Sequence, residues 1–362
     1  MTNLTRRSVA GLLAATPILG RAATMPGSTP VRLSLNENPF GPSPNVLRAL
    51  RDAIPEAGRY GDAAEADALV RQIATLEGVT PQHVVLGELL ETLGLFLAAR
   101  GARGGNFVYS VPGYPALVNA GRPVGTSVIG VPLDASLGND LPGLTRAVTS
   151  ETKALYLVNP HNPSGTASDP ATFERFLGEV SRKTLVVVDE AYIEYAPRAR
   201  SAVALTRSGA NVAVFRTLDK IYGLAGLPIG YLLAPPTLVR AFQDAGFGDA
   251  HGIGRLPITA ARAALADQDW VKQVRVRIAA GRDRLTRTLD ELGLRHTDSQ
   301  ANFVFFESPV PAIAVRQAFA QRGLLVAKPF PPLDGWLRIS IGTEEDVVRT
   351  DRALRDLFRK PG

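Results

Sequence analysis

The 362-residue sequence contains no cysteine. This absence excludes disulfide bonds, thiolate catalysis and zinc sites built from cysteine. Histidine is scarce as well, and His83, His161, His251 and His296 lack the spacing of metal ligands. We therefore expect no metal site in this protein.

The sequence also lacks a block of basic residues. Lysine and arginine total 40 against 34 acidic residues, and the acidic residues are spread along the chain. This balance gives no basic face of the kind that binds nucleic acid, so we expect no nucleic-acid partner. A hydrophobic content of 45% can form a large core, and the chain length favours two domains.

The first 23 residues differ in composition from the rest of the chain. Arg6 and Arg7 precede an apolar run at 9–19 and small residues around Ala22. This order is typical of an export signal, and the paired arginines indicate the twin-arginine route. The run is too short for a membrane span, so we expect no stable membrane anchor. We predict a periplasmic protein with a signal at 1–23; the alternative is a cytoplasmic protein with a disordered leader.

The middle of the chain alternates short apolar runs with helical patterns such as those at 89–100 and 170–182. Continuous apolar runs of this length are typical of strands buried on both faces of a parallel sheet. We therefore predict an α/β fold, with a large domain at 51–264 whose central sheet is mostly parallel and covered by helices on both faces. The predicted strands are 106–111, 153–158, 184–188 and 211–216.

The pattern changes after about residue 257. We predict a smaller α+β domain at 265–362, with the N-terminal segment 24–50 packed against it. Its expected helices are 269–292, 311–322 and one at the C-terminus, and its expected strands are 302–307, 324–327 and 336–341.

Polar residues follow the four predicted strands. Tyr114 comes after the first strand, Asn162 after the second, Asp189 and Tyr192 after the third, and Lys220 after the fourth. Taken singly, each has a structural explanation as a turn, a helix cap or a solvated side chain. Carboxyl ends of parallel strands meet at one edge, however, where ligands bind. Together these residues match the needs of pyridoxal phosphate: a lysine for its aldehyde, a carboxylate for its ring nitrogen, an aromatic ring to stack on it, and donors for its phenolate oxygen.

Five motifs make this interpretation specific. From about residue 33 onward the chain resembles the fold-type I, class I/II aminotransferases, which depend on pyridoxal phosphate, and is most similar to their histidinol-phosphate aminotransferase branch. The motifs are LNENPFGPSP (35–44), NPHNPSG (159–165), DEAYIEY (189–195), TLDKIYGLAGL (217–227) and LRISIGT (337–343).

The resemblance implies roles for the residues at the strand ends. Lys220 would hold the cofactor as a Schiff base and then act as the general base of a 1,3-proton shift. Asp189 would pair with the ring nitrogen and Tyr114 would stack on the ring. Asn162 and Tyr192 would donate to the phenolate oxygen.

The resemblance also implies substrate and partner contacts. Arg338 would bind the substrate α-carboxylate through its bidentate fork, with Asn36 and Asn162 near the substrate. Tyr60 would reach the cofactor phosphate of a neighbouring subunit, which implies a homodimer with shared active sites.

The chain departs from the family pattern at the cofactor phosphate. Glu88 and Leu89 occupy a turn where small residues are expected, Asp219 replaces a serine, and Pro228 replaces an arginine. A partly buried ion pair contributes about 4 kcal/mol at an effective dielectric constant of 20, so these changes predict weakened cofactor binding. Other cations would have to compensate, and Arg216 and Arg255 are the candidates near in sequence.

The predicted function is amino-group transfer between an amino acid, or an amino-alcohol phosphate, and a 2-oxo acid. One alternative is a decarboxylase, oxidase or cyclase that uses the same cofactor on the same scaffold. Another is a non-catalytic binding protein that keeps the fold. The sequence leaves these alternatives open, because side-chain orientation around the α-carbon decides which bond breaks.

Overall fold

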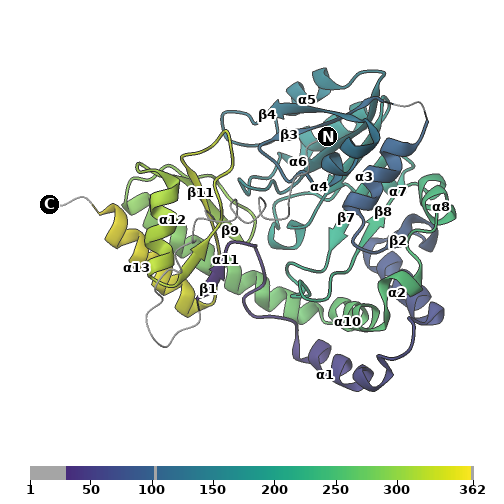
Figure 1. Ribbon diagram of the computed structural model, residues 1–362, viewed down its shortest axis with the longest axis horizontal. Helices are drawn as coiled ribbons and strands as arrows, with labels where there is room; N and C mark the ends of the chain where they lie inside the picture. The colour runs from purple at the N-terminus through teal and green to yellow at the C-terminus, as the bar shows by residue number, and fades with distance from the viewer. Residues whose placement is uncertain (1–29, 102–103, 360–362) are drawn as a thin grey trace, which may run out of the picture.

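The computed structural model describes residues 30–101 and 104–359. The predicted export signal at 1–23 lies outside these residues. The described chain forms a large unit built on a seven-stranded sheet and a smaller unit beside it (Figure 1). The predicted α/β class is confirmed.

The central sheet is mostly parallel. Strand β8 is antiparallel to both of its neighbours, whereas the other six strands share one direction. The carboxyl ends of these six strands therefore lie at one edge of the sheet. In spatial order the strands are β2 (Val84–Leu86), β8 (Gly230–Leu233), β7 (Val212–Thr217), β6 (Leu185–Asp189), β5 (Thr152–Val158), β3 (Asn106–Val111) and β4 (Ser127–Pro132).

The sequence pattern found the central strands and missed the outer ones. Strands β6, β7 and β8 are buried along their whole length, and β5 nearly so. β2 and β8 are only three and four residues long, too short for a reliable pattern. β4 lies at the sheet edge and is largely exposed, so it has no continuous apolar run.

Helices connect the strands and cover the sheet. Several begin where the sequence dictates; α6, for example, starts with Pro170 after Asp169, whose carboxylate accepts from the Thr172 amide. The helices of the large unit are α2 (Ala63–Glu77), α3 (Leu90–Ala99), α4 (Ala116–Ala120), α5 (Leu141–Ala147), α6 (Pro170–Val180), α7 (Val203–Arg207), α8 (Pro236–Asp244), α9 (Ala250–Ile253) and α10 (Arg255–Ala266). Single 3-10 turns lie at Ile54–Glu56, Pro81–His83, Arg122–Val124 and Ile193–Tyr195.

The smaller unit combines two short sheets with three helices. β1 (Val31–Leu33) pairs in parallel with β10 (Leu324–Val326), and β9 (Phe303–Glu307) pairs antiparallel with β11 (Trp336–Ser340). The N-terminal segment thus adds a strand to the C-terminal unit. The helices are α11 (Gln268–Glu291), α12 (Ala312–Gln321) and α13 (Glu344–Phe358).

Helix α1 (Pro44–Ala53) follows β1 but packs against α10, away from the small sheets (Figure 1). The proposed domain boundary at residue 264 falls inside α10, two residues before that helix ends. Within the described ranges, every helix is too short or too polar to cross a lipid bilayer.

Candidate active site

A cavity of about 560 Å³ opens at the carboxyl edge of the central sheet. The large unit lines it with residues at or after the carboxyl ends of β2, β3, β5, β6 and β7, and the small unit contributes residues 35–37, Phe330 and Arg338. The edge that the strand pattern predicted therefore carries the cavity. The predicted site residues that line it are Asn36, Glu88, Tyr114, Asn162, Asp189, Tyr192, Asp219, Lys220 and Arg338.

Asp189 is the last residue of β6, and only 2% of its surface is exposed. Its carboxylate accepts from the Tyr156 hydroxyl at 2.9 Å and from the Ala191 amide at 3.0 Å. Burial nevertheless raises the pKa of Asp189 to about 6, because the two donors and the nearby Lys220 only partly offset desolvation. A cationic ring nitrogen would satisfy this carboxylate.

Lys220 lies three residues beyond the end of β7 and is half-buried. Within the described part of the chain its ammonium makes no hydrogen bond or ion pair at close range, although its charge acts on Asp189, Glu88 and Asp219. An amine held in a cavity without a close partner can react with a ligand.

Tyr192 is fixed by amide groups from both units. Its hydroxyl accepts from Nδ2 of Asn36 at 3.0 Å and from Nδ2 of Asn162 at 3.4 Å. Asn36 has a positive φ of 58°, and Ser340 of β11 holds it by accepting from its amide at 3.0 Å and donating to its Oδ1 at 2.8 Å. The strain of this backbone conformation is typical of functional sites.

Arg338 extends from β11 toward the same cluster. Its guanidinium donates to Oδ1 of Asn162 and, at 2.7 Å, to the carbonyl of Ser34. It lies against the rings of Phe303 and Phe330, at 5.3 and 5.0 Å from their centroids. Burial lowers the pKa of Arg338, but a guanidinium remains charged in proteins. Its Nε–H is buried without a described partner, so the group retains capacity for an anionic ligand.

Tyr114 follows β3 and lines the cavity with a ring that is 43% exposed. Burial of its hydroxyl raises the pKa of Tyr114 to about 12, so the ring is neutral at physiological pH. An exposed neutral ring at the cavity wall can stack on a planar ligand.

Glu88 and Asp219 form a pair of acidic groups at one end of the cavity. Glu88 Oε1 accepts from the Thr217 hydroxyl at 3.0 Å, while the Asp219 Oδ1 is buried without a described partner. Glu88 is exposed to the cavity, and desolvation there, with a further contribution from Asp219, raises the pKa of Glu88 to about 8. Burial also raises the pKa of Asp219, and Lys220 opposes that shift.

Leu89 was predicted to contact the cofactor, and this stays a prediction for its backbone amide, because its side chain is turned away from the cavity. The residue lies in the hydrophobic core, 5% exposed, and does not line the cavity. Helix α3 begins at Leu90, so its first turn presents Leu90 and Glu91 to the cavity instead.

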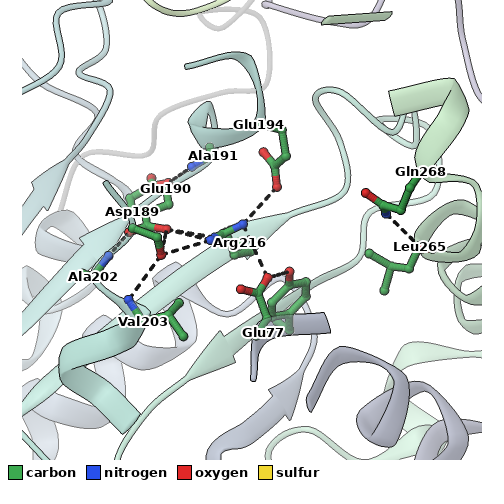
Figure 2. Close-up of polar contacts among 12 residues, drawn as sticks. Glu77, Asp189, Glu190, Ala191, Glu194, Ala202, Val203, Arg216, Leu265 and Gln268 are labelled. Carbon is green, nitrogen blue, oxygen red and sulfur yellow. Dashed lines mark hydrogen bonds and ion pairs between the residues drawn. The ribbon is translucent and has the colours of Figure 1, made fainter. Parts of the chain in front are cut away.

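Arg216, one of the two candidates for the missing phosphate-binding cation, does not reach the cavity. Side chains alternate along β7, so Phe215 and Thr217 line the cavity and Arg216 points to the opposite face. Figure 2 shows Arg216 surrounded by Glu77, Glu190 and Glu194. These three ion pairs measure 3.4, 2.9 and 3.2 Å, respectively.

Arg255 and Tyr60 both lie outside this cavity. Arg255 pairs with Glu65 at 3.6 Å and donates to the carbonyl of Tyr60 at 3.4 Å, so it does not serve the phosphate end of its own chain. The Tyr60 side chain is 79% exposed and packs edge-on against His251. Its predicted contact with a neighbouring subunit involves a second chain and stays a prediction.

Sequence reasoning missed several residues of the cavity wall. Thr217 could have been found, because it is the polar last residue of an apolar strand inside the TLDK motif. Leu35 and Phe330 gave no signal, because they lie in irregular segments that only the packing of the small unit brings to the cavity. No group of three or more metal-ligating side chains was found among the residues that the structure describes.

The cavity fits pyridoxal phosphate at its ring end. A buried carboxylate, a cavity lysine, a fixed pair of donors and an exposed aromatic ring are present together. At the phosphate end the fit depends on the two acidic groups, because no cation of the described chain pairs with Glu88 or Asp219 there.

Comparison with known proteins agrees with this chemistry. The family model described as "Aminotransferase class I and II" matches residues 28–354. A histidinol-phosphate aminotransferase of Brevibacillus brevis is 33% identical over 334 residues, covering 90% of each chain. An aromatic amino acid aminotransferase of Thermobifida fusca is 36% identical over 337 residues, again covering 90% of each.

The fold of this chain resembles that of a solved structure over almost the whole length of both chains. The histidinol-phosphate aminotransferase of Sinorhizobium meliloti, in complex with pyridoxal-5'-phosphate, superposes with a TM-score of 0.83 and 30% identity. The match covers 96% of this chain and 99% of that one.

The chain therefore belongs to the class I and II aminotransferases, enzymes of the fold-type I class. Within that class it is a pyridoxal-phosphate-dependent transaminase of the histidinol-phosphate aminotransferase-like branch.

Proposed function

We propose that this aminotransferase acts on a neutral α-amino acid with an aliphatic or aromatic side chain. The observation that carries this proposal is that the described residues place one cation, Arg338, at the substrate end of the cavity. Arg338 can neutralise one carboxylate, and Leu35 and Phe330 offer apolar surface beside it. Glu37, which lines the cavity from the small unit, already pairs with Arg32, so that arginine is not free to neutralise a second anionic group on the substrate.

When bound, pyridoxal phosphate supplies an aldehyde that takes the amino group and a ring that accepts electrons. Asp189 holds a proton on the ring nitrogen, because its buried carboxylate requires a cationic partner. Arg338 binds and orients the substrate carboxylate. Lys220 would hold the cofactor aldehyde through Nζ, and the same amine would take the proton from the substrate α-carbon. Tyr192 and Asn162, whose polar groups lie 3.4 Å apart at the junction of the two units, would donate hydrogen bonds to the phenolate oxygen of the cofactor.

An amino-alcohol phosphate is the second candidate substrate. The names of several relatives favour it. It would place a dianionic phosphate, instead of the monoanionic carboxylate of an amino acid, in a cavity whose described lining has two cations, Lys220 and Arg338, and several carboxylates. Electrostatic repulsion therefore favours the neutral amino acid.

Single half-reactions would test this proposal. Each amino acid, and histidinol phosphate, is mixed with the cofactor-loaded protein while the visible absorbance is followed. We expect leucine or phenylalanine to convert the cofactor to its amine form with a kcat/KM at least about tenfold above that of aspartate or histidinol phosphate. Faster conversion by histidinol phosphate would overturn the substrate proposal. Carbon dioxide release or oxygen consumption without conversion would favour the decarboxylase or oxidase alternative.

We further propose export by the twin-arginine route, supported by Arg6 and Arg7 and the apolar run that follows them. Sequencing the N-terminus of protein from the periplasmic fraction would test export. A start near residue 23 is expected, and an intact Met1 in all material would contradict the proposal.

A further inference from the structure

The hydroxyl of Tyr192 accepts two hydrogen bonds and makes none of its own within the described chain. Nδ2 of Asn36 lies 3.0 Å from it and Nδ2 of Asn162 lies 3.4 Å from it. An amide NH2 group can only donate, so both bonds use the lone pairs of the hydroxyl oxygen. Because Tyr192 lines the cavity, its hydroxyl hydrogen is left for a ligand there.

The amide of Asn162 can take only this orientation. Its Oδ1 accepts from the guanidinium of Arg338, and a guanidinium has no acceptor. Turning the amide would place two donors against each other. The NH2 group of Asn162 therefore has to face Tyr192.

The orientation of the Asn36 amide depends instead on one hydroxyl. Ser340 Oγ accepts from the Asn36 backbone amide at 3.0 Å and donates to Oδ1 at 2.8 Å. Nδ2 of Asn302 donates to the Asn36 carbonyl at 2.9 Å. The backbone of Asn36 is thus held on both sides, and the side-chain amide is the part that is free to turn.

Turning the Asn36 amide would reverse both of its side-chain contacts. Its NH2 group would then face Ser340, which is only 3% exposed. The hydroxyl hydrogen of Ser340 would be left buried without an acceptor, and such a loss costs free energy. The amide oxygen would face Tyr192 and accept the hydrogen of its hydroxyl. The hydroxyl of Ser340 therefore favours the orientation in which Asn36 donates to Tyr192.

We propose that Ser340 is a positioning residue that, by fixing the Asn36 amide, keeps the hydroxyl hydrogen of Tyr192 available to the phenolate oxygen of pyridoxal phosphate. A donor at this oxygen weakens the oxygen's hold on the proton of the neighbouring Schiff-base nitrogen. Ser340 thus sets the pH at which the Lys220-linked cofactor loses that proton, although its side chain does not line the cavity. This inference goes beyond the substrate preference proposed above and holds for any substrate.

The test is a pH titration of the visible absorbance of the full-length, cofactor-loaded protein without substrate. The absorbance changes when the Schiff-base nitrogen loses its proton, and it reports only on protein that has folded and bound the cofactor. We expect Ser340→Ala to raise the midpoint by about one pH unit, a tenfold gain in proton affinity, because Asn36 can then turn and take the Tyr192 hydrogen. An unchanged midpoint would overturn the inference.

Two further variants show whether the effect passes through Tyr192. Tyr192→Phe removes the hydroxyl and should raise the midpoint at least as much as Ser340→Ala. In the double variant the orientation of Asn36 no longer matters, so the midpoint should equal that of Tyr192→Phe alone. A further rise equal to that of Ser340→Ala would contradict the proposed path.

Ser340→Thr keeps the hydroxyl and should keep the wild-type midpoint. A rise like that of the alanine variant would contradict a role for the hydroxyl. Thr288→Val is the matched control for losing a buried hydroxyl in the small unit, because Thr288 is 1% exposed and donates to the Asp351 carboxylate at 3.0 Å. It should lower stability and leave the midpoint unchanged, and an equal rise would overturn the specific role of Ser340.

The charged and titratable side chains around the cofactor site are the same in all of these proteins apart from Tyr192. They are Glu37, Glu88, Glu91, Tyr114, Asp189, Asp219, Lys220 and Arg338. Differences between the midpoints therefore report on the hydrogen bonds that have been changed.

Discussion

At the scale of single residues, Asp189 shows how burial prepares a group for a ligand. Its carboxylate is nearly inaccessible and has two hydrogen bonds, yet burial holds its pKa at about 6. The cofactor-free protein thus carries a destabilising charge that a cationic ring nitrogen would satisfy. Perturbed pKa values of this kind are common at functional sites.

Asp189→Asn should therefore stabilise the cofactor-free protein at alkaline pH. The folded-state pKa is raised above the unfolded value of 3.8, so the ionised carboxylate costs roughly 3 kcal/mol above pH 6. The cost disappears as the pH falls from 6 toward 4, because the folded protein then binds the proton. Denaturant unfolding at pH 8 and pH 4.5 would measure this difference.

Asparagine can keep both existing contacts, accepting from Ala191 and donating to the Tyr156 oxygen. Asp244→Asn is the control, because Asp244 lies exposed on α8. Equal stability of wild type and Asp189→Asn at both pH values would contradict the prediction. The same variant should bind pyridoxal phosphate more weakly than wild type.

At the scale of elements, strand β7 has the cavity on one face and the buried ion-pair cluster of Arg216 on the other. Thr217 at its end faces the cavity, whereas Arg216 faces a cluster of carboxylates contributed by α2 and the segment after β6. Both faces of β7 are buried, so the sequence pattern could not assign its side chains to one face or the other. Nearness in sequence made Arg216 a candidate for the phosphate site, and only the structure shows that its side chain faces away from the cavity.

Arg216→Met should destabilise the fold by about 3–5 kcal/mol, because it leaves Glu77, Glu190 and Glu194 buried without their cation. Arg200→Met is the matched control: Arg200 pairs with Glu174 at 2.9 Å, but both side chains are largely exposed. It should cost less than about 1 kcal/mol. Chemical denaturation at neutral pH compares the two, and similar losses would contradict a structural role for the buried cluster.

At the scale of the whole molecule, the cavity exists only where the two units meet. Arg338 and Asn36 come from the small unit, while Lys220 and Asp189 come from the central sheet. The hydrogen bonds of Tyr192 and Arg338 join the units across the cavity. A change in the packing of the small unit would therefore move the substrate-binding residues Arg338 and Asn36 but leave the position of Lys220 on the central sheet unchanged.

The exposed Tyr60 leads to a prediction about assembly. If Tyr60 completes the site of a second copy, Lys220→Ala and Tyr60→Ala chains should complement each other. When the two variants are co-expressed, about half of the dimers contain one chain of each. Each such hybrid has one intact site out of two. About a quarter of wild-type activity should therefore return at limiting cofactor. Each variant expressed alone is the control. Activity no greater than that of the Tyr60→Ala protein alone would contradict shared sites.

The sequence by itself determined the α/β class, the central strands and most of the polar residues that line the cavity. Lys220, Asp189 and Asn162 were predictable because apolar runs mark parallel strands and the residues after them must meet at one edge. Only the tertiary structure decided which face of β7 carries Arg216 and that Leu89 belongs to the core. It also brought Phe330 to the cavity. These outcomes depend on packing between segments far apart in the chain, which local periodicity does not record.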